Sequence, residues 1–356
     1  MKQRTFKLKE FAQDISVAVK DAQLSPLKRF VGLEHYDSNE PVITRFTDTS
    51  LLSSSVKEFS ENDILIARRN VYLRRAGIVF FSGLTSGDSI VLRIYNDCED
   101  RTGIPKDDAI RIIPFILNSN DFWAYANKHA DGMNSKRISK DMLYDYEFSL
   151  PPIEEQRILA DKLWAAYRLK ESYKKLLTAT QEMVKSQFIE MFYGMETTPV
   201  KDYIDDSFPG EWGTEDKDGN GVKVIRTTNF TNSGKLNLAD VVTRSIEDRK
   251  VARKQIKKYD TILERSGGTA DNPVGRVVLF EEDDLFLCNN FTHVLRFKDV
   301  DPRFAFYALY YFYQTNRTAI RSMGSKTTGI QNLNMSKYLE IGIPNASDAV
   351  SYTHLR

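Results

Sequence analysis

The feature that most constrains this chain is an uninterrupted stretch near its middle. Residues 153–193 contain neither glycine nor proline. Pro151 and Pro152 stand directly before this stretch, where a helix tolerates a missing N–H, and Glu154 and Glu155 lie where the helix dipole favours negative charge. The pattern predicts one continuous helix. At a rise of about 1.5 Å per residue, such a helix would be roughly 60 Å long.

Apolar residues recur at steps of three, four or seven along this stretch. They form a seam that comprises Leu159, Leu163, Ala166, Tyr173, Leu177, Val184 and Met191. Because an isolated helix would leave such a seam in water, the pattern predicts a coiled-coil-type helix that packs against a partner helix. The alternative is a core helix of a single domain, but helices of globular proteins average only about 11 or 12 residues.

The segments on the two sides of this helix resemble each other. Short apolar runs lie at residues 63–68, 77–81 and 89–94 before the helix and at 260–265, 275–280 and 292–297 after it. Each set is followed, in the same order, by a helical stretch (112–129 and 302–321), a glycine-led polar loop (132–137 and 324–329) and a closing strand (147–151 and 340–344). Short β-branched runs bounded by glycine and aspartate predict buried strands. The repeated order predicts an internal duplication.

These patterns together predict an α+β protein with two similar domains of mixed helix and sheet. Two domains are also the ordinary number for a chain of 356 residues. The expected boundaries are residues 1–151 for the first domain, 152–194 for the long helix, 195–345 for the second domain and 346–356 for a tail.

The composition favours a globular protein of the cytoplasm. Hydrophobic residues make up 41% and charged residues 28% of the chain, as in ordinary globular proteins. The sequence contains no run of about 18 apolar residues, so no membrane span is predicted. No apolar segment follows the basic N-terminus as it would in a secretory signal. The two cysteines, Cys98 and Cys288, are far apart in the sequence and are expected to be reduced thiols.

Positive charge is clustered although the net charge is only +1. Residues 68–75 contain arginines and no acidic residue, and residues 244–258 are also strongly basic. Such clusters are usually solvated surface, but they can bind phosphate with an affinity that falls steeply with salt. The sequence is therefore compatible with a local nucleic-acid site, whereas the net charge argues against a heavily basic nucleic-acid-binding protein.

No enzyme motif is complete in this chain. Residues 324–327, Gly-Ser-Lys-Thr, resemble the end of a phosphate-binding loop, but Ser325 separates the glycine from the lysine. Asn272 and Pro273 lack the second proline and the aromatic residue of an adenine methyltransferase motif and are interpreted as a turn. The histidines have no metal-ligand spacing, and His293 is predicted to be structural. We predict no catalytic residue, no metal and no cofactor in this chain.

The chain resembles the specificity subunit of type I restriction–modification systems. The strongest element is residues 150–156, Leu-Pro-Pro-Ile-Glu-Glu-Gln, followed by an Ile-Leu-Ala helix. In that family this motif marks the junction between a target recognition domain and a spacer helix. The strand after Asp63 or Asp260 and the glycine-led loop, each present twice, also fit. The resemblance covers about residues 1–345.

The resemblance implies a subunit that recognises DNA and is not itself an enzyme. Each domain would read one part of a split target in double-stranded DNA, with half-sites about one helical turn, on the order of 34 Å, apart. The subunit would position modification subunits, which methylate adenine with S-adenosylmethionine, and a restriction subunit, which uses ATP and Mg²⁺ to translocate and cut DNA. The alternatives are a two-headed protein-interaction scaffold without DNA specificity and the specificity half of a single-chain enzyme.

Members of that family normally carry a second spacer helix that packs antiparallel on the first. Here residues 346–356 do not continue the pattern, so we expect a truncated gene whose tail is not native. The seam of the long helix would then lack its partner within the chain. We therefore expect the isolated chain to self-associate through this seam.

Polar residues near the ends of the predicted strands are the candidates for contact with DNA. In the first domain they are Arg68, Arg69, Arg74, Arg75, Asn134, Lys136 and Arg137, and in the second they are Arg265, Ser266, Lys326, Thr327, Thr328, Gln331 and Asn332. Arginine and lysine can pair with guanine, asparagine and glutamine with adenine, and serine, threonine and lysine with phosphate. Loops on a fixed scaffold are the natural place for readout that varies.

Overall fold

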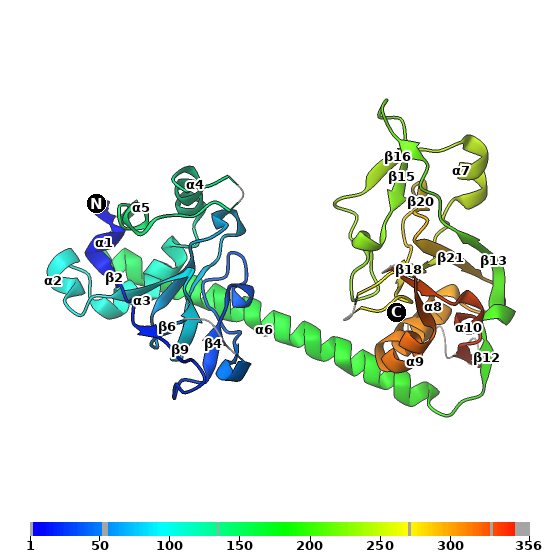
Figure 1. The fold of residues 1–356 in the computed structure, drawn as a ribbon, viewed down its shortest axis with the longest axis horizontal. Coiled ribbons are helices and arrows are strands. Elements are labelled where there is room, and N and C mark those ends of the chain that lie inside the picture. Colours follow the sequence, from blue (N-terminus) through cyan, green and yellow to red (C-terminus); the bar gives the residue numbers. More distant parts are fainter. Residues whose placement is uncertain (1–2, 52–55, 134, 270–271, 328–329, 346–356) are drawn as a thin grey trace. The chain divides into compact units, whose positions relative to one another are not determined.

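A computed structural model describes residues 3–345 except 52–55, 134, 270–271 and 328–329. The expected tail, 346–356, lies outside the described residues. The chain divides into two compact units, here called the first unit (Met1–Leu176) and the second unit (Leu177–Arg356). The division falls inside the long helix α6 (Ile153–Phe192), which Figure 1 shows in green. Both units combine helices and sheets, so the predicted α+β class is confirmed.

Helix α6 is continuous, as the sequence predicts, and its start is fixed by the proline motif. The Gln156 side chain is buried, and its amide donates a hydrogen bond to the carbonyl of Pro151 at 2.7 Å. The Gln156 backbone N–H donates to the carbonyl of Pro152 at 3.0 Å. One glutamine therefore ties the end of the preceding strand to the first turn of the helix.

The first unit is built on two sheets and one strand pair within its described residues. A four-stranded sheet has the order β2 (Ala12–Asp14), β10 (Ser89–Ile94), β7 (Ile64–Ala67), β8 (Ala76–Ile78). A five-stranded sheet has the order β3 (Ala18–Val19), β6 (Val56–Phe59), β9 (Gly83–Ser86), β4 (Arg29–Val31), β5 (Thr47–Asp48). Strand β1 (Arg4–Lys7) pairs antiparallel with β11 (Glu147–Leu150). The helical segments are α1 (Leu8–Phe11), η1 (Leu33–His35), η2 (Thr49–Leu51), η3 (Val71–Leu73), α2 (Cys98–Thr102), α3 (Lys106–Ile116), α4 (Asn120–Lys128) and α5 (Lys140–Tyr144).

The second unit repeats this plan in its described residues. A four-stranded sheet has the order β13 (Ile204–Pro209), β21 (Thr292–Phe297), β17 (Thr261–Glu264), β19 (Val277–Leu279), and a second has the order β14 (Thr214–Glu215), β16 (Val242–Ser245), β15 (Val222–Ile225), β20 (Phe286–Cys288). Strand β12 (Thr197–Pro199) pairs with β24 (Gly342–Pro344), and β18 (Ser266–Gly267), β23 (Ile330–Leu333) and β22 (Gly324–Thr327) form a small sheet. The helical segments are η4 (Val200–Tyr203), η5 (Thr227–Asn229), α7 (Asp248–Lys254), α8 (Pro302–Thr315), α9 (Arg317–Ser322) and α10 (Met335–Tyr338).

The two units share the same hydrogen bonds at equivalent places, which supports the predicted duplication. Arg93 holds both carboxylate oxygens of Asp63 at 2.7 Å, and Arg296 holds those of Asp260 at 3.0 and 2.7 Å. The residue just before each aspartate has a positive φ of 69°. Each unit also has a parallel strand pair in its other large sheet, β4 with β9 in the first unit and β15 with β20 in the second.

Aromatic and aliphatic side chains from helices cover the four-stranded sheet in each unit. In the first unit Phe122 and Trp123 of α4 are fully buried, and in the second Phe304 and Tyr313 of α8 are buried. Both cysteines are free and buried. Among the described residues, no helix combines the length and the apolar character that crossing a membrane requires.

Two local predictions need correction. The helical stretches predicted at 112–129 and 302–321 are each a pair of helices, α3 with α4 and α8 with α9. A new N-cap causes the first break, because the Ser119 hydroxyl accepts from the Phe122 N–H at 3.1 Å. The glycine-led loop predicted at 324–329 begins as strand β22, which pairs with β23 in a hairpin. Its polar composition misled the prediction, because an exposed hairpin can be as polar as a loop.

The predicted seam of α6 is only partly covered. Leu163 packs on the core of the first unit, while Leu159, Ala166, Tyr173, Leu177, Val184 and Met191 are exposed. Near the start of the helix, the seam lines a hollow of about 440 Å³ together with Ile112 and Phe115 of α3. Tyr173 and Leu177 are 62% and 60% exposed. An apolar stripe of this kind marks a surface that another helix can cover.

We expect Tyr173→Glu combined with Leu177→Glu to reduce self-association of the isolated chain. Two charges on the stripe would oppose burial of the seam against a second helix, because an unpaired charge is costly to bury. Sedimentation velocity over a range of concentrations measures the effect. Lys175→Glu, which changes charge on the same exposed stretch without touching the seam, is the control. A wild-type chain that stays monomeric at high concentration would contradict the expectation.

Candidate nucleic-acid interface

The structure brings four predicted residues of the first unit together where β7 ends. The chain segment around residue 137 runs antiparallel to the end of β7, with Arg69 and Arg137 as bridge partners. The Ile138 N–H donates to the carbonyl of Arg68 at 3.1 Å, and the Asn70 N–H donates to the carbonyl of Lys136 at 2.7 Å. Arg68, Arg69, Lys136 and Arg137 therefore lie on adjacent chain segments, although the sequence separates the two pairs widely.

A carboxylate that the sequence did not single out lies between the two bridged arginines. Asp88 Oδ2 is 3.5 Å from Arg69 Nε, and Asp88 Oδ1 is 3.5 Å from Arg137 Nη2. The Asp88 carbonyl accepts the N–H of Arg68 at 3.1 Å, so the turn between β9 and β10 is attached to the same strand end. The carboxylate restrains both guanidinium groups while all three side chains remain partly exposed.

The other predicted residues of the first unit have different surroundings. The Arg75 side chain donates to the carbonyls of Leu33 and Arg69, both at 3.0 Å, and burial lowers its pKa. Arg75 therefore stabilises the backbone at Leu33 and Arg69 through its hydrogen bonds. Arg74 has a left-handed backbone, with φ at 51°, and its Nη1 donates to Asn120 Oδ1 at 2.9 Å. Asn134 lies outside the described residues.

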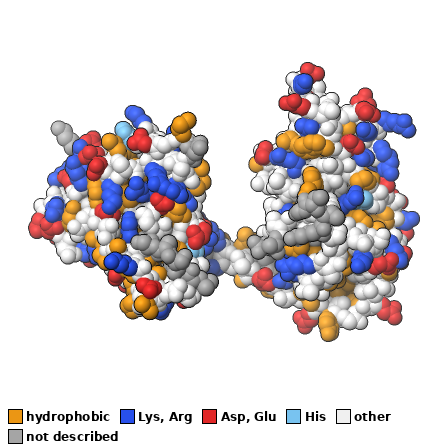
Figure 2. Space-filling view, viewed as in Figure 1, with side chains coloured by type: hydrophobic (Ala, Val, Ile, Leu, Met, Phe, Trp, Pro, Cys, Tyr) orange, Lys and Arg blue, Asp and Glu red, His pale blue; other side chains and the backbone are white. Residues whose placement is uncertain are grey.

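One lysine that the sequence did not single out extends the positive surface. Lys57 Nζ donates to the carbonyl of Ser89 at 2.9 Å, directly beside the turn that carries Asp88. Burial lowers the pKa of Lys57, and the nearby charges of Lys140 and Arg68 lower it further. Figure 2 shows lysine and arginine side chains gathered on the visible face of the first unit. No sequence motif links these residues, because they come from separate strands and helices.

The second unit brings its own predicted residues together at the equivalent place. The Leu333 N–H donates to the carbonyl of Arg265 at 2.8 Å. Ser266 faces Asn332 across the β18–β23 ladder, and the Ser266 hydroxyl donates to Asn332 Oδ1 at 2.7 Å. Gln331 faces Gly267 in the same ladder. These residues form a polar surface with much less charge than that of the first unit.

The remaining predicted residues of the second unit lie on or beyond the neighbouring strand. Lys326 and Thr327 belong to β22, where their backbones are opposite Gln331 and Ile330. Thr328 lies outside the described residues. The hairpin of β22 and β23 thus carries this part of the predicted site on regular backbone.

A buried ion pair supports the strand end in the second unit. Arg276 Nε donates to Glu264 Oε2 at 2.6 Å, and Glu264 is almost fully buried. Arg276 takes the place that Arg75 has in the first unit, because the N–H of Glu264 donates to the carbonyl of Arg276 as the N–H of Ala67 donates to that of Arg75. Ala67 offers no carboxylate, so Arg75 donates to backbone carbonyls instead.

The basic stretch at 244–258 is a weaker candidate than its sequence indicates. Arg253 pairs with Asp206 at 2.9 Å, Lys254 with Glu211 at 3.0 Å, and Lys258 with Asp283 at 2.9 Å. These acidic partners come from distant parts of the sequence. Their charges offset much of the attraction that the lysines and arginines would exert on phosphate.

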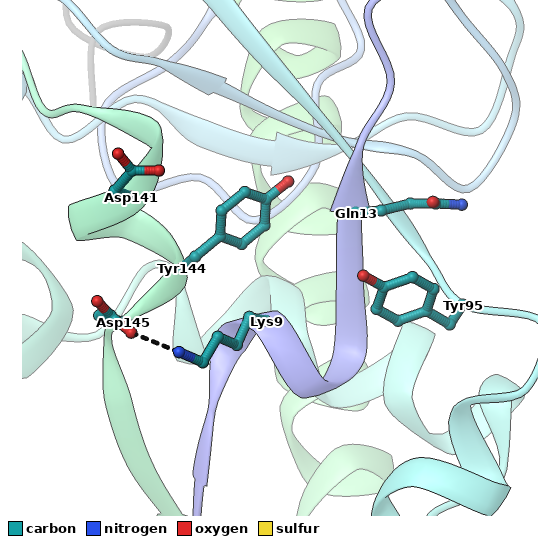
Figure 3. Close-up of a pocket in the computed structure, with 6 residues that line it drawn as sticks. All are labelled: Lys9, Gln13, Tyr95, Asp141, Tyr144 and Asp145. Carbon is teal, nitrogen blue, oxygen red and sulfur yellow. Dashed lines mark hydrogen bonds and ion pairs between the residues drawn. The ribbon is translucent and has the colours of Figure 1, made fainter.

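A surface hollow of about 440 Å³ in the first unit is a separate feature (Figure 3). Its lining comprises Lys9, Gln13, Tyr95, Asp141, Tyr144 and Asp145. Lys9 points to Asp145, with Nζ and Oδ1 2.8 Å apart, and the lining mixes both charges. Among the described residues, no cluster of three or more metal-ligating side chains is present. The hollow therefore offers no arrangement that selects one class of ligand.

His293, which lies close to Arg265, gives a prediction on pH. Its Nε2 is 2.7 Å from the Ser207 hydroxyl, and burial together with the charge of Arg265 lowers the pKa of His293 to about 4. Between pH of about 6.5 and about 4, the unfolded chain binds a proton that the folded chain does not. The free energy of unfolding should therefore decrease as the pH falls through this window. Urea unfolding at several pH values should show a smaller decrease for His293→Gln, and an unchanged slope would contradict this role.

Comparison with known proteins identifies a matching family model and similar solved structures. Residues 207–348 match the family model for the type I restriction modification DNA specificity domain. Similar solved structures include a chain from a study of complex assembly and conformational transition of the type I restriction–modification system (17% identity, 96% of this chain and 86% of that chain, TM-score 0.48). Others are the HsdS subunit from Thermoanaerobacter tengcongensis (16%, 96% and 84%, TM-score 0.38) and the type I S subunit from M. genitalium (14%, 97% and 85%, TM-score 0.48). No curated protein matches the chain significantly.

Proposed function

Because residues 207–348 match the family model for the type I restriction modification DNA specificity domain, we propose that this chain is the DNA sequence-recognition subunit of a type I restriction–modification complex. The matched residues include the surface formed by Arg265, Ser266, Gln331 and Asn332. In this proposal that surface contacts the bases of one half-site. Arg265 is exposed, and Gln331 and Asn332 are partly exposed at a strand end, which suits this role, since base edges are read by side chains on a rigid support.

The observation that carries the proposal to the first unit is the shared framework of the two units. The first unit lies outside the matched residues, yet it has the same order of the four-stranded sheet, an equivalent aspartate–arginine pair and a polar surface at the equivalent strand end. Two copies of one reader would contact two half-sites of a split target. The arginine-rich surface of the first unit is also suited to phosphate contacts that strengthen binding.

Helix α6 would act as the spacer between the two readers, and its exposed seam would meet a partner helix. In this proposal the chain positions modification subunits and a restriction subunit and performs no chemistry itself. S-adenosylmethionine, ATP and Mg²⁺ would be bound by those subunits. The scaffold alternative differs in one respect, because it gives no reason for the strand-end surfaces to prefer any DNA sequence.

Selection from a random duplex library tests the proposal. The full chain, together with the modification subunits of its operon, is incubated with duplexes that contain a randomised block, and the retained DNA is sequenced. We expect two short enriched blocks at a fixed spacing, with retention that falls as salt rises. Retention without sequence preference would reject the proposal and favour the scaffold. The modification subunits alone provide the control.

A further inference from the structure

Two positions at the strand end are occupied by residues of different chemistry in the two units. Arg69 faces Arg137 in the first unit, and Ser266 faces Asn332 in the second. The positions are equivalent because each pair directly follows the same backbone hydrogen bond, from residue 138 to residue 68 and from residue 333 to residue 265. A pair of guanidinium groups in one unit is thus replaced by a hydroxyl and an amide in the other.

A third equivalent position differs just as much. The N–H of Arg68 donates to the carbonyl of Asp88 at 3.1 Å, and the N–H of Arg265 donates to the carbonyl of Phe291 at 2.9 Å. Asp88 lies in the turn directly before β10, and Phe291 lies in the turn directly before β21, the equivalent strand of the second unit. The Phe291 side chain is 38% exposed. A carboxylate beside the arginines of the first unit therefore corresponds to an exposed aromatic ring in the second.

The set in the first unit is suited to acceptor groups. Asp88 restrains Arg69 and Arg137 through contacts of 3.5 Å. Because both side chains are already partly ordered, each loses less conformational entropy when it binds DNA. Arginine pairs bidentately with O6 and N7 of guanine, and this contact discriminates guanine from the other bases. The carboxylate can also accept from N4 of cytosine. All three side chains thus match a G·C pair.

The set in the second unit has no charge and contains an apolar surface. Asn332, which the Ser266 hydroxyl restrains at 2.7 Å, is the residue type that pairs with N6 and N7 of adenine. The exposed ring of Phe291 can contact the methyl group of thymine, which no other base of DNA carries. An amide and an aromatic ring at these equivalent positions match an A·T pair.

We propose that the first unit reads a G·C pair through Arg69 and Arg137, and that the second unit reads an A·T pair through Asn332 and Phe291. The inference rests on the proposed function and adds the bases that each half selects. Asp88 is a positioning residue for the two arginines.

The random-duplex selection described above, repeated with variants of the full chain and the same modification subunits, tests the inference. Arg69→Gln should abolish the preference at one position of one half-site, with discrimination against the wrong base reduced roughly 10- to 100-fold. That position should be a G·C pair in the wild-type target. Asp88→Asn should weaken the same preference without changing the other half-site. Since both residues are at the surface, thermal unfolding of each variant should match that of the wild type.

Phe291→Ala and Asn332→Ala should relax an A·T position in the other half-site. Arg74→Gln is the matched control in the first unit, because it removes a charge outside the three positions. It should reduce retention of all duplexes and leave the selected sequence unchanged. The inference is overturned if the position relaxed by Arg69→Gln is an A·T pair, if Arg69→Gln leaves the sequence preference intact, or if variants of both units relax the same half-site. Absence of any preference in the wild type would instead reject the proposed function.

Discussion

Replacing Arg296 with methionine is expected to destabilise the second unit by about 3–5 kcal/mol. Arg296 holds both oxygens of Asp260, and Asp260 is only 3% exposed. Without the guanidinium group, a buried carboxylate would lose its counter-charge. Domains are stable by only about 5–15 kcal/mol, so this loss removes a large share of the total. Urea unfolding followed by amide hydrogen exchange should show that the loss is confined to residues of the second unit.

The equivalent pair of the first unit provides the matched control. The Arg93 side chain is 37% exposed whereas that of Arg296 is 16% exposed, so water can solvate Asp63 more readily when the arginine is removed. Arg93→Met should therefore cost less than Arg296→Met and should affect only the first unit. Arg296→Lys, which keeps the charge, should retain part of the stability. Equal and small losses, below about 1 kcal/mol in both units, would show that the pairs act like exposed ones.

The sequence contained enough information for the architecture because the duplication repeats its structural residues. Asp63 and Asp260 precede buried strands, and each aspartate accepts hydrogen bonds from an arginine on a neighbouring strand. The long helix was also predictable, because a stretch without glycine or proline after Pro151 and Pro152 leaves few alternatives. In both cases a local pattern determines the backbone directly.

The helix pairs and the hairpin of β22 and β23 were not predictable in the same way. The break between α3 and α4 depends on one side-chain cap by Ser119, within a stretch whose apolar pattern continues. Strand β22 begins with polar residues and is stabilised by pairing with β23, which in turn pairs with β18 from a distant part of the sequence. Long-range strand pairing is not encoded in local composition.

The sequence located about half of the candidate surface. Arg68, Arg69 and Arg137 were identified because arginines stand near predicted strand ends. Lys57 and Asp88 were missed, since their position beside these arginines arises from the packing of separate strands. The equivalence of positions 88 and 291 was likewise hidden, because the turns that carry them, Ser-Gly-Asp and Asn-Asn-Phe, share no residue type.

Replacing Lys175 with proline is expected to abolish the fixed spacing of the proposed split target. Residues 172–184 of α6 are exposed, so burial of side chains contributes little to the stability of the helix there. A proline in a helix interior removes one backbone hydrogen bond, clashes with the preceding turn and costs about 3 kcal/mol or more. The packed cores lie elsewhere, so each unit should remain folded. Two readers on a bent or flexible spacer would lose the advantage of binding both half-sites together, which is about 100-fold or more for linked modules.

Competition between duplexes measures this effect. With the wild-type chain and its modification subunits, a duplex with both half-sites at the selected spacing should outcompete duplexes with one half-site or with a changed spacing. For Lys175→Pro the three classes should compete almost equally, whereas Lys175→Ala, which removes the same charge and keeps the helix, should behave like the wild type. Binding to a single half-site should be similar in all three proteins, because neither strand-end surface is altered. A proline variant that keeps the wild-type spacing preference would mean that α6 does not set the distance between the half-sites and that the partner subunits do.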